Sequence, residues 1–419
     1  MDVPDAIQLM GDKQWQEIKS RLTGKFNKMM KGLFRQKGAQ LDINILTSDE
    51  AQEFITTHAG ILDGGFQKVE MSDKMRERLT RSNYIFSGIK TFHELNEAFP
   101  SMLDENGNKK PFERFLNDVQ KINDTYNANY LHAEYNFVQA SATMAAKWEQ
   151  FSEDGDRYNL QYRTAKDDKV RPEHAALDGV TLPMSDSFWE TYYPPNGWNC
   201  RCTVVQVRKQ KYPATEHAEA MSRGEEAMNG ERYNIFRFNS GKQGKTMPDY
   251  NPYTIKRCND CDVAKGKLKL GFVPDYQLCQ GCVMIRKCSE DRNKDNSAKA
   301  TKKSPEVKKL QGTTISNPNF NHEVLVTGGS IKEWTNQPHK DYAAKNSILK
   351  HISKVFREAN YIGVVDNFKQ KPGVIQSHLF ETTVLGDVSW IVIREYDDGR
   401  FILHSLSDGD RIKTGIRKE

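Results

Sequence analysis

Apolar residues near the start of the chain recur at intervals of three and four, the spacing of one face of a helix. They predict an amphipathic helix over residues 14–36 with Lys and Arg between the apolar positions. The apolar positions are Trp15, Ile18, Leu22, Phe26, Met29 and Leu33. A membrane-surface helix is one interpretation, but a face that packs on a core or a partner protein is commoner for basic helices in soluble assemblies.

The same spacing predicts further helices in the first third of the chain. They are expected near residues 74–82, near 92–98 and over a long stretch from 111 to 151. Four alanines between residues 140 and 146 would let a neighbouring helix approach the last of them closely. We therefore expect this region to be mainly helical.

The last hundred residues have a pattern of helices first and strands afterwards. A helical spacing runs through Leu349, Ile352 and Phe356. Gly-Asp and Asp-Asp-Gly turns then separate three segments typical of strands, residues 377–386, 389–396 and 400–406. This order predicts helices packed on an antiparallel meander.

Length and charge limit the possible classes of protein. At 419 residues the chain exceeds what one hydrophobic core usually supports, so several domains are expected. Its 61 basic and 56 acidic residues leave a net charge of +5, too balanced to predict a nucleic-acid coat. No apolar run predicts a membrane span, and the start MDVPDAIQLMGDKQWQ lacks a signal-peptide pattern, so we expect a product of the cytoplasm.

All seven cysteines fall in the range from Cys200 to Cys288. In a reducing compartment such clustering indicates metal binding rather than disulfide bonds. Two CxxC pairs separated by seventeen residues predict a zinc ribbon, in which four thiolates hold a structural Zn2+. Its ligands would be Cys258, Cys261, Cys279 and Cys282, with Cys288 as a spare. Unpaired cysteines in a loop are the alternative.

A second candidate site combines the segment VRPEHAALDG with the closing stretch PPNGWNCRC. If Pro172 opens a helix, His174 and Asp178 share one of its faces. Cys200 and Cys202 lie two apart on a predicted strand, so both thiols point one way and a disulfide between them would strain the backbone. These cysteines form either a zinc cluster with His174 or two small buried thiols under the loop.

The stretch YRTAKDDKVRPEHAALDGVTLPMSDSFWETYYPPNGWNCRC, residues 162–202, resembles the signature of the phage Mu F-like minor head protein family, also called the phage head morphogenesis family. The resemblance rests on an Arg-Thr-x3-Asp entry, a VRPxH box, a Leu-Asp-Gly turn and a PPNGWxCRC closure. The preceding HAEYNFVQASATMAAKW resembles the family more loosely.

This resemblance implies a structural role in the virion, as a low-copy minor capsid protein at or near the portal vertex. The implied partners are the phage portal, other capsid or scaffold proteins and phage DNA, with no membrane. It also implies that the rigid loop closes a compact core whose polar or metal-bound centre is His174, Asp178, Cys200 and Cys202.

The segments IKEWTNQPHKDYAAKN, SWIVIRE and HSLSDGDRI resemble a phage-associated nuclease-like domain of the barnase, EndoU, colicin and RelE-like class, which is found fused behind Mu F-like proteins. That resemblance implies metal-independent cleavage of host RNA by a general base, a general acid and a cation that stabilises the phosphorane. The candidate catalytic residues are His339, Lys340, His378 and Ser405.

Together the patterns predict a multidomain α+β protein with a mainly helical N-terminal half, a compact loop-rich core, a zinc-ribbon-like insertion, and a C-terminal α+β domain with helices packed on an antiparallel sheet. The expected divisions are a helical region at 1–110, a Mu F-like core at 111–210, an extension with the zinc ribbon at 211–296, a lysine-rich linker at 297–314 and a nuclease-like domain at 315–419.

Three functions fit this organisation. The first is a head morphogenesis protein that carries a ribonuclease-like effector domain. The second is a purely structural minor capsid protein whose C-terminal domain binds nucleic acid or protein without catalysis. The third is a packaging accessory in which lysines of the ribbon and the linker bind nucleic acid, with a steep salt dependence.

Overall fold

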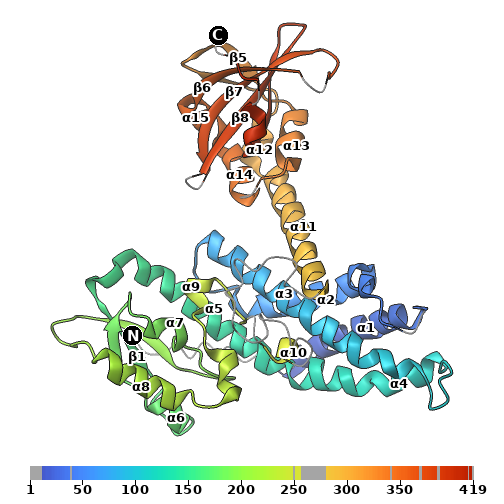
Figure 1. Cartoon of the computed structure of the whole chain (residues 1–419), viewed down its shortest axis with the longest axis vertical. Coiled ribbons are helices and arrows are strands. Elements are labelled where there is room, and N and C mark those ends of the chain that lie inside the picture. Colours follow the sequence, from blue (N-terminus) through green and yellow to red (C-terminus); the bar gives the residue numbers. More distant parts are fainter. Residues whose placement is uncertain are drawn as a thin grey trace. The chain divides into compact units, whose positions relative to one another are not determined.

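The structure is a computed structural model that describes residues 12–37, 40–248, 251–255, 280–339, 342–367, 370–384, 387–413 and 415–417. The chain divides into two compact units, Met1–Ser289 and Glu290–Glu419. Figure 1 shows the elements of each unit in the colours of the sequence. No helix within the described ranges is both long enough and apolar enough to cross a membrane.

Long helices make up most of the first unit (Figure 1). They are α1 (Asp12–Phe34), α2 (Asp49–Asp63), α3 (Asp73–Ala98), α4 (Phe112–Asn123) and α5 (Leu131–Asp154). The predicted N-terminal amphipathic helix is confirmed as α1, whose Leu22, Phe26 and Met29 are buried in the core of this unit. The hydroxyl of Ser72 caps α3 by accepting a hydrogen bond from the N–H of Met75.

Two expected short helices, near 74–82 and 92–98, are parts of the single helix α3. The residues between them did not fit an apolar stripe because α3 buries polar side chains on its inward face. Ser87, Lys90, Thr91 and Glu94 are all buried there. The long helix expected over 111–151 is instead α4 and α5 with a π-helical turn, Asp124–Asn129, between them.

A small antiparallel sheet follows the helices. Its strands β1 (Asn159–Arg163), β2 (Thr181–Pro183) and β3 (Thr203–Val207) have the order β2-β1-β3. Short helices α6 (Pro172–Ala175) and α7 (Phe188–Thr191) lie in the connections. The unit continues with α8 (His217–Ala227), α9 (Ser240–Gln243) and α10 (Pro252–Ile255).

The predicted zinc ribbon lies mostly outside the described residues, because Cys258, Cys261 and Cys279 fall in the gap before residue 280. Its fourth ligand, Cys282, is buried in α11 (Gln280–Lys303). The segment expected as a linker, 297–314, is helical over most of its length in α11 and α12 (Pro305–Leu310). Lys and Ala are good helix formers, which accounts for this difference from the composition-based expectation.

A curled six-stranded sheet forms the centre of the second unit (Figure 1). Its strands are β4 (Thr314–Asn317), β5 (Phe320–Leu325), β6 (Asn360–Asp366), β7 (Val374–Val384), β8 (Asp387–Tyr396) and β9 (Phe401–Ser407), in the order β4-β5-β9-β8-β7-β6. The meander β7-β8-β9 corresponds to the three predicted strands. Within the described part of this unit, β5 and β9 pair in parallel and the other neighbouring strands pair antiparallel.

Helices α13 (Gly328–Asn336), α14 (Tyr342–Ile348) and α15 (Ile352–Glu358) lie between β5 and β6 in the chain. Trp334 of α13 and Phe356 of α15 are fully buried in one core cluster with Phe380 and Ile391 of the sheet. The opposite face carries a smaller cluster that includes Leu379 and Val392. The expected arrangement of helices on a sheet is confirmed for this unit.

Candidate functional site

His174 sits in the four-residue helix α6, where Pro172 occupies the first turn as expected. Only 2% of His174 is exposed to solvent. Its Nδ1 atom lies 3.6 Å from Sγ of Cys200 and 3.7 Å from Sγ of Cys202. The ring therefore faces both thiols, although 26 residues separate it from the nearer cysteine in the chain.

Both thiols face His174 because of the way the loop enters β3. Residue Asn199 adopts a positive φ of 57°, and the N–H of Cys200 donates to the carbonyl of Gly197 at 3.1 Å. Strand β3 begins directly after Cys202 and pairs with β1. Arg201, between the cysteines, points away and forms a bidentate ion pair with Asp167 at 2.5 and 2.6 Å.

The contact between the two thiols shifts their pKa values in opposite directions. A hydrogen bond with Cys202 lowers the pKa of Cys200 well below its ordinary value, against the effect of burial, and His174 acts in the same direction. The same contact raises the pKa of Cys202, and burial adds to this. The contact between the two thiols therefore favours ionisation of one of them.

Residues of the quoted signature contact one another around this centre. Thr164 donates from both its N–H and its hydroxyl to Asp178, at 2.8 and 3.1 Å. Asp178 thus holds the start of the loop. Because α6 ends at Ala175, Asp178 lies beyond the helix and does not share a helix face with His174. Tyr162 donates to the side-chain carbonyl of Asn196 at 2.8 Å. The motif is in large part a set of mutual contacts that close the loop.

A cavity of about 410 Å³ opens beside the three ligand candidates. Its lining includes three cationic side chains but no carboxylate: it consists of His132, Asn136, Ala165, Lys169, Val170, Arg171, His174, Asn199, Cys200, Arg201 and Cys202. The ligand atoms of His174, Cys200 and Cys202 all lie within 4.8 Å of one another, so this group could hold a metal ion.

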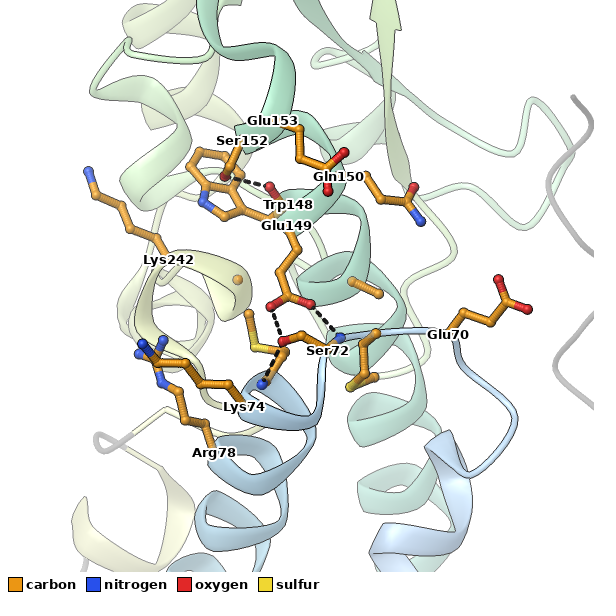
Figure 2. Close-up of a pocket in the computed structure, with 14 residues that line it drawn as sticks. Glu70, Ser72, Lys74, Arg78, Trp148, Glu149, Gln150, Ser152, Glu153 and Lys242 are labelled. Carbon is orange, nitrogen blue, oxygen red and sulfur yellow. Dashed lines mark hydrogen bonds between the residues drawn. The ribbon is translucent and has the colours of Figure 1, made fainter. Parts of the chain in front are cut away.

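A larger hollow of about 700 Å³ lies at the start of α3 against α5 and α9 (Figure 2). Ser72 donates to Glu149 from its hydroxyl at 2.5 Å and from its N–H at 3.1 Å. Lys74, Arg78 and Lys242 gather on one side of this hollow in the figure. No motif of the sequence pointed to it, and its mixed charges do not define one ligand class.

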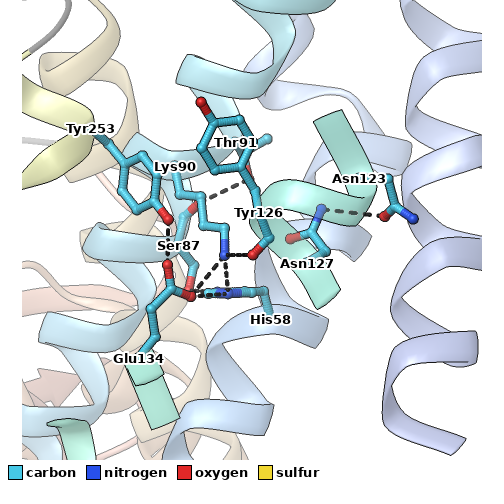
Figure 3. Close-up of polar contacts among 9 residues, drawn as sticks. All are labelled: His58, Ser87, Lys90, Thr91, Asn123, Tyr126, Asn127, Glu134 and Tyr253. Atoms are coloured by element: carbon cyan, nitrogen blue, oxygen red, sulfur yellow. Dashed lines mark hydrogen bonds and ion pairs between the residues drawn. The ribbon is translucent and has the colours of Figure 1, made fainter. Parts of the chain in front are cut away.

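Sequence reasoning missed a buried ionic network inside the first unit (Figure 3). Lys90 contacts Glu134 at 2.7 Å, and His58 contacts the same carboxylate at 3.2 Å. Burial and the nearby Lys90 lower the pKa of His58 to about 4. Burial raises the pKa of Glu134, but Lys90 and His58 outweigh it and bring the value to about 2. No sequence signal marks this network, since Lys and Glu on helices usually face solvent.

Tyr253 of α10 donates its hydroxyl proton to the other oxygen of Glu134. The Lys90 ammonium also donates to the backbone carbonyl of Tyr126 at 2.7 Å. The network therefore joins α2, α3, α5 and α10. Each charged group of the network has a partner of opposite charge or a hydrogen bond, which offsets part of the cost of burying it.

In the second unit, His339 is buried, and its Nε2 atom lies 3.2 Å from the hydroxyl of Ser389. Its Nδ1 atom lies 4.0 Å from the carboxylate of Asp408. A cavity of about 330 Å³ lies against this ring, lined by Lys294, Gln337, Pro338, His339, Leu406, Ser407, Asp408 and Gly409. Lys340 is outside the described residues.

His378 lies elsewhere on the sheet. It contacts Glu395 at 3.0 Å and the hydroxyl of Tyr361 at 3.1 Å, and it pairs across the strands with Ile393. Ile393 is four residues beyond Ser389 on β8, roughly 13 Å along the strand. The structure therefore does not bring His378 next to His339.

Ser405 is buried and pairs with Val392, so it lies on the sheet face opposite to His378. The three described members of the expected quartet, His339, His378 and Ser405, thus occupy separate places. His404, a further histidine of this unit, lies 3.9 Å from Glu333.

Comparisons with known proteins support the Mu F-like family for one segment. Residues 106–205 match the family described as Phage Mu protein F like protein. The "Putative capsid assembly protein F" of Escherichia phage Mu is 36% identical over 104 residues, which are 25% of this chain and 21% of that protein. The "Mu-like prophage FluMu F protein" of Haemophilus influenzae is 32% identical over 102 residues, 24% of this chain and 22% of that protein. The chain thus spans about a fifth of the length of these relatives.

The second unit has a separate match. Residues 292–403 match the family described as Large polyvalent protein-associated domain 3. This match does not support the expected fusion to a nuclease domain. No solved structure matches the chain.

Proposed function

We propose that this protein acts in the assembly of a phage head, through the segment 106–205. The observation that carries the proposal is that residues 106–205, which match the family of Mu protein F like proteins, contain a loop closed by the Arg201–Asp167 and Thr164–Asp178 pairs. A closed, rigid loop is suited to holding a fixed surface for a partner. The partners would be the portal and other capsid or scaffold proteins.

The test is an amino-acid substitution introduced into the genome that encodes the chain. Arg201→Ala removes the bidentate pair that holds the loop, and it should lower the yield of complete heads counted by electron microscopy. Arg157→Ala, which breaks an exposed ion pair with Asp154 outside the loop, is the matched control. Normal head yield with Arg201→Ala and with deletion of 106–205 would exclude an assembly role.

The proposed location is the interior of the virion at or near the portal vertex. Cross-linking of purified virions followed by mass spectrometry should then join lysines of this chain to the portal protein. Cross-links to the major coat protein alone would contradict the location while leaving a role in assembly intact.

A second candidate function, cleavage of RNA, concerns residues 290–419. The favouring observation is that the buried His339 lines a cavity together with Lys294 and Asp408. In such a reaction His339 would take the proton of the ribose 2′-hydroxyl as its oxygen attacks the phosphorus, and Lys294 would bind the phosphate. The bond to the 5′-oxygen breaks, and that oxygen takes up a proton from water or from the protonated His339. This arrangement replaces the quartet proposed from the sequence, because His378 and Ser405 lie at other positions.

The full-length protein should then cleave labelled RNA in excess chelator. His339→Ala should lower the rate at least about 100-fold, whereas His378→Ala should retain most of it. RNA binding without turnover, weakening steeply with salt, would instead identify this unit as a non-catalytic binding module. Equal cleavage by both variants would point to a contaminating nuclease.

We also propose a structural Zn2+ bound by Cys258, Cys261, Cys279 and Cys282, on the spacing of their two CxxC pairs. Its test is the zinc content of the purified chain against that of Cys258→Ser/Cys261→Ser. Equal content in the two proteins would refute the ribbon.

A further inference from the structure

Three potential ligand atoms from two distant parts of the chain converge in the first unit. Nδ1 of His174 comes from α6, while Sγ of Cys200 and Sγ of Cys202 come from the loop before β3. The two loops are held independently of this contact, by the Thr164–Asp178 and Arg201–Asp167 pairs. The convergence is therefore fixed by the surrounding fold.

The distances suit a tetrahedral ion. A Zn2+ with Zn–S bonds of about 2.3 Å and a Zn–N bond of about 2.0–2.1 Å places sulfur and nitrogen about 3.6 Å apart. The observed separations between Nδ1 and the sulfurs are 3.6 and 3.7 Å, and all three atoms lie within 4.8 Å of one another. The two nitrogen–sulfur distances therefore match those of a single bound ion.

The histidine ring has no other role in the described structure. His174 is 98% buried, and its Nε2 atom has no hydrogen-bond partner among the described residues. Two thiols are weak partners for the remaining nitrogen, so a buried polar ring is left poorly satisfied. A metal ion bound at Nδ1 would replace these weak contacts with a coordination bond, and the proton of the ring would then lie on Nε2.

We propose that His174 Nδ1, Cys200 Sγ and Cys202 Sγ bind one Zn2+, and that its fourth coordination position opens into the 410 Å³ cavity. Thiolate and imidazole ligands favour zinc, and two thiolates balance its charge. A fourth ligand from solvent, water or a small anion, then lies near the cationic Arg171 and Lys169 that line the cavity.

This site would connect α6 to the loop before β3. Among the described residues, the cavity lining has no carboxylate that could act as a base beside a metal-bound water, although it includes a second histidine, His132. We assign the ion a structural role with one exchangeable position, because it joins two separate segments of the fold. This inference does not depend on the assembly function or on the zinc ribbon.

The test must distinguish zinc bound at this site from zinc bound by the predicted zinc ribbon. In full-length Cys258→Ser/Cys261→Ser, one equivalent of zinc should remain, and cobalt in its place should give a thiolate charge-transfer band of two-sulfur intensity. Adding His174→Ala or Cys200→Ser should remove the ion. His217→Ala, which changes an exposed histidine of the same unit, should retain it.

A second measurement does not depend on these last variants folding. X-ray absorption of the Cys258→Ser/Cys261→Ser protein should show two sulfur and two lighter neighbours around zinc. Azide should shift the visible bands of the cobalt form if the fourth position is open; unchanged bands would refute the open position. A folded protein without bound metal, or zinc unaffected by both His174→Ala and Cys200→Ser, would overturn the site and leave two buried thiols.

Discussion

Glu94 is a buried acid of the first unit whose carboxyl group is poorly compensated. It is fully buried on α3, and neither carboxylate oxygen accepts a hydrogen bond of good geometry from the described residues. Burial raises its pKa to about 8, although Lys90 acts in the opposite direction. The folded protein therefore keeps this acid protonated over a range of pH in which an unfolded chain would ionise it.

Replacing Glu94 with Gln should make the protein more stable at alkaline pH. A folded pKa above the ordinary 4.5 means that wild-type stability falls as pH rises from about 4.5 to about 8. At pH 8.5 the variant should gain about 2–4 kcal/mol in the free energy of unfolding, with little change at pH 4.5. Urea denaturation at the two pH values measures both.

The control for this prediction is Glu153→Gln, which alters an exposed acid on α5. It should change the free energy of unfolding by less than about 0.5 kcal/mol at either pH. A loss of stability in Glu94→Gln that is equal at both pH values would show that the carboxyl group makes a specific contact in the folded state.

At the residue scale, the sequence pointed to sites whose residue types, such as cysteine and histidine, are typical metal ligands. His174, Cys200 and Cys202 stood out as potential ligands, and the fold brings them together. Lys90 and Glu134 gave no signal, because only the packing of four helices turns common surface residues into a buried pair. His339 and His378 shared a chemical type, but strand register separates them.

Among the helices, the contact of α9 with α5 depends on a residue without a side chain. Gly241 of α9 lies so close to Trp148 that an added Cβ would come within 2.2 Å of the Trp148 Cβ atom. That atom is bound directly to the backbone of α5 and cannot move away as the end of a flexible side chain can. Gly60 of α2, by contrast, has no heavy atom within 4 Å of an added Cβ.

Gly241→Ala and Gly60→Ala should therefore have opposite effects. The first should lower the free energy of unfolding by about 1–3 kcal/mol because it forces two helices apart. The second should raise it by about 0.5–1 kcal/mol because alanine favours a helix over glycine. Chemical denaturation of the two variants measures the difference, and a gain in both would mean that α9 shifts freely over α5.

At the element scale, sequence patterns located elements with a continuous apolar stripe and local pairing. Helix α1 and the meander β7-β8-β9 are of this kind. Helix α3 was predicted as two short helices, because the polar residues that it buries interrupt the apolar pattern. Strands β4, β5 and β6 were not predicted. β4 and β5 form a short antiparallel hairpin, but β5 joins the rest of the sheet through a parallel pairing with β9, which no local turn signals.

The two units have separate hydrophobic cores. Buried residues of the main cluster in the first unit all lie between Trp15 and Ile285, and those of the second unit's main cluster lie between Val307 and Leu406. Composition predicted several domains but placed a boundary in the lysine-rich segment. The fold places it earlier, inside α11, because charge and polarity of a segment do not reveal which core its few apolar residues join.

Separate cores predict separate unfolding. Phe54 of α2 and Phe380 of β7 are both fully buried, each in the core of its own unit. Truncation of either to alanine should cost about 3–5 kcal/mol, and only in the transition of the unit that contains it. Calorimetry should show two transitions, and hydrogen exchange read by mass spectrometry assigns each to its residues. A single transition lowered equally by both substitutions would mean that α11 transmits the loss and that the units fold as one.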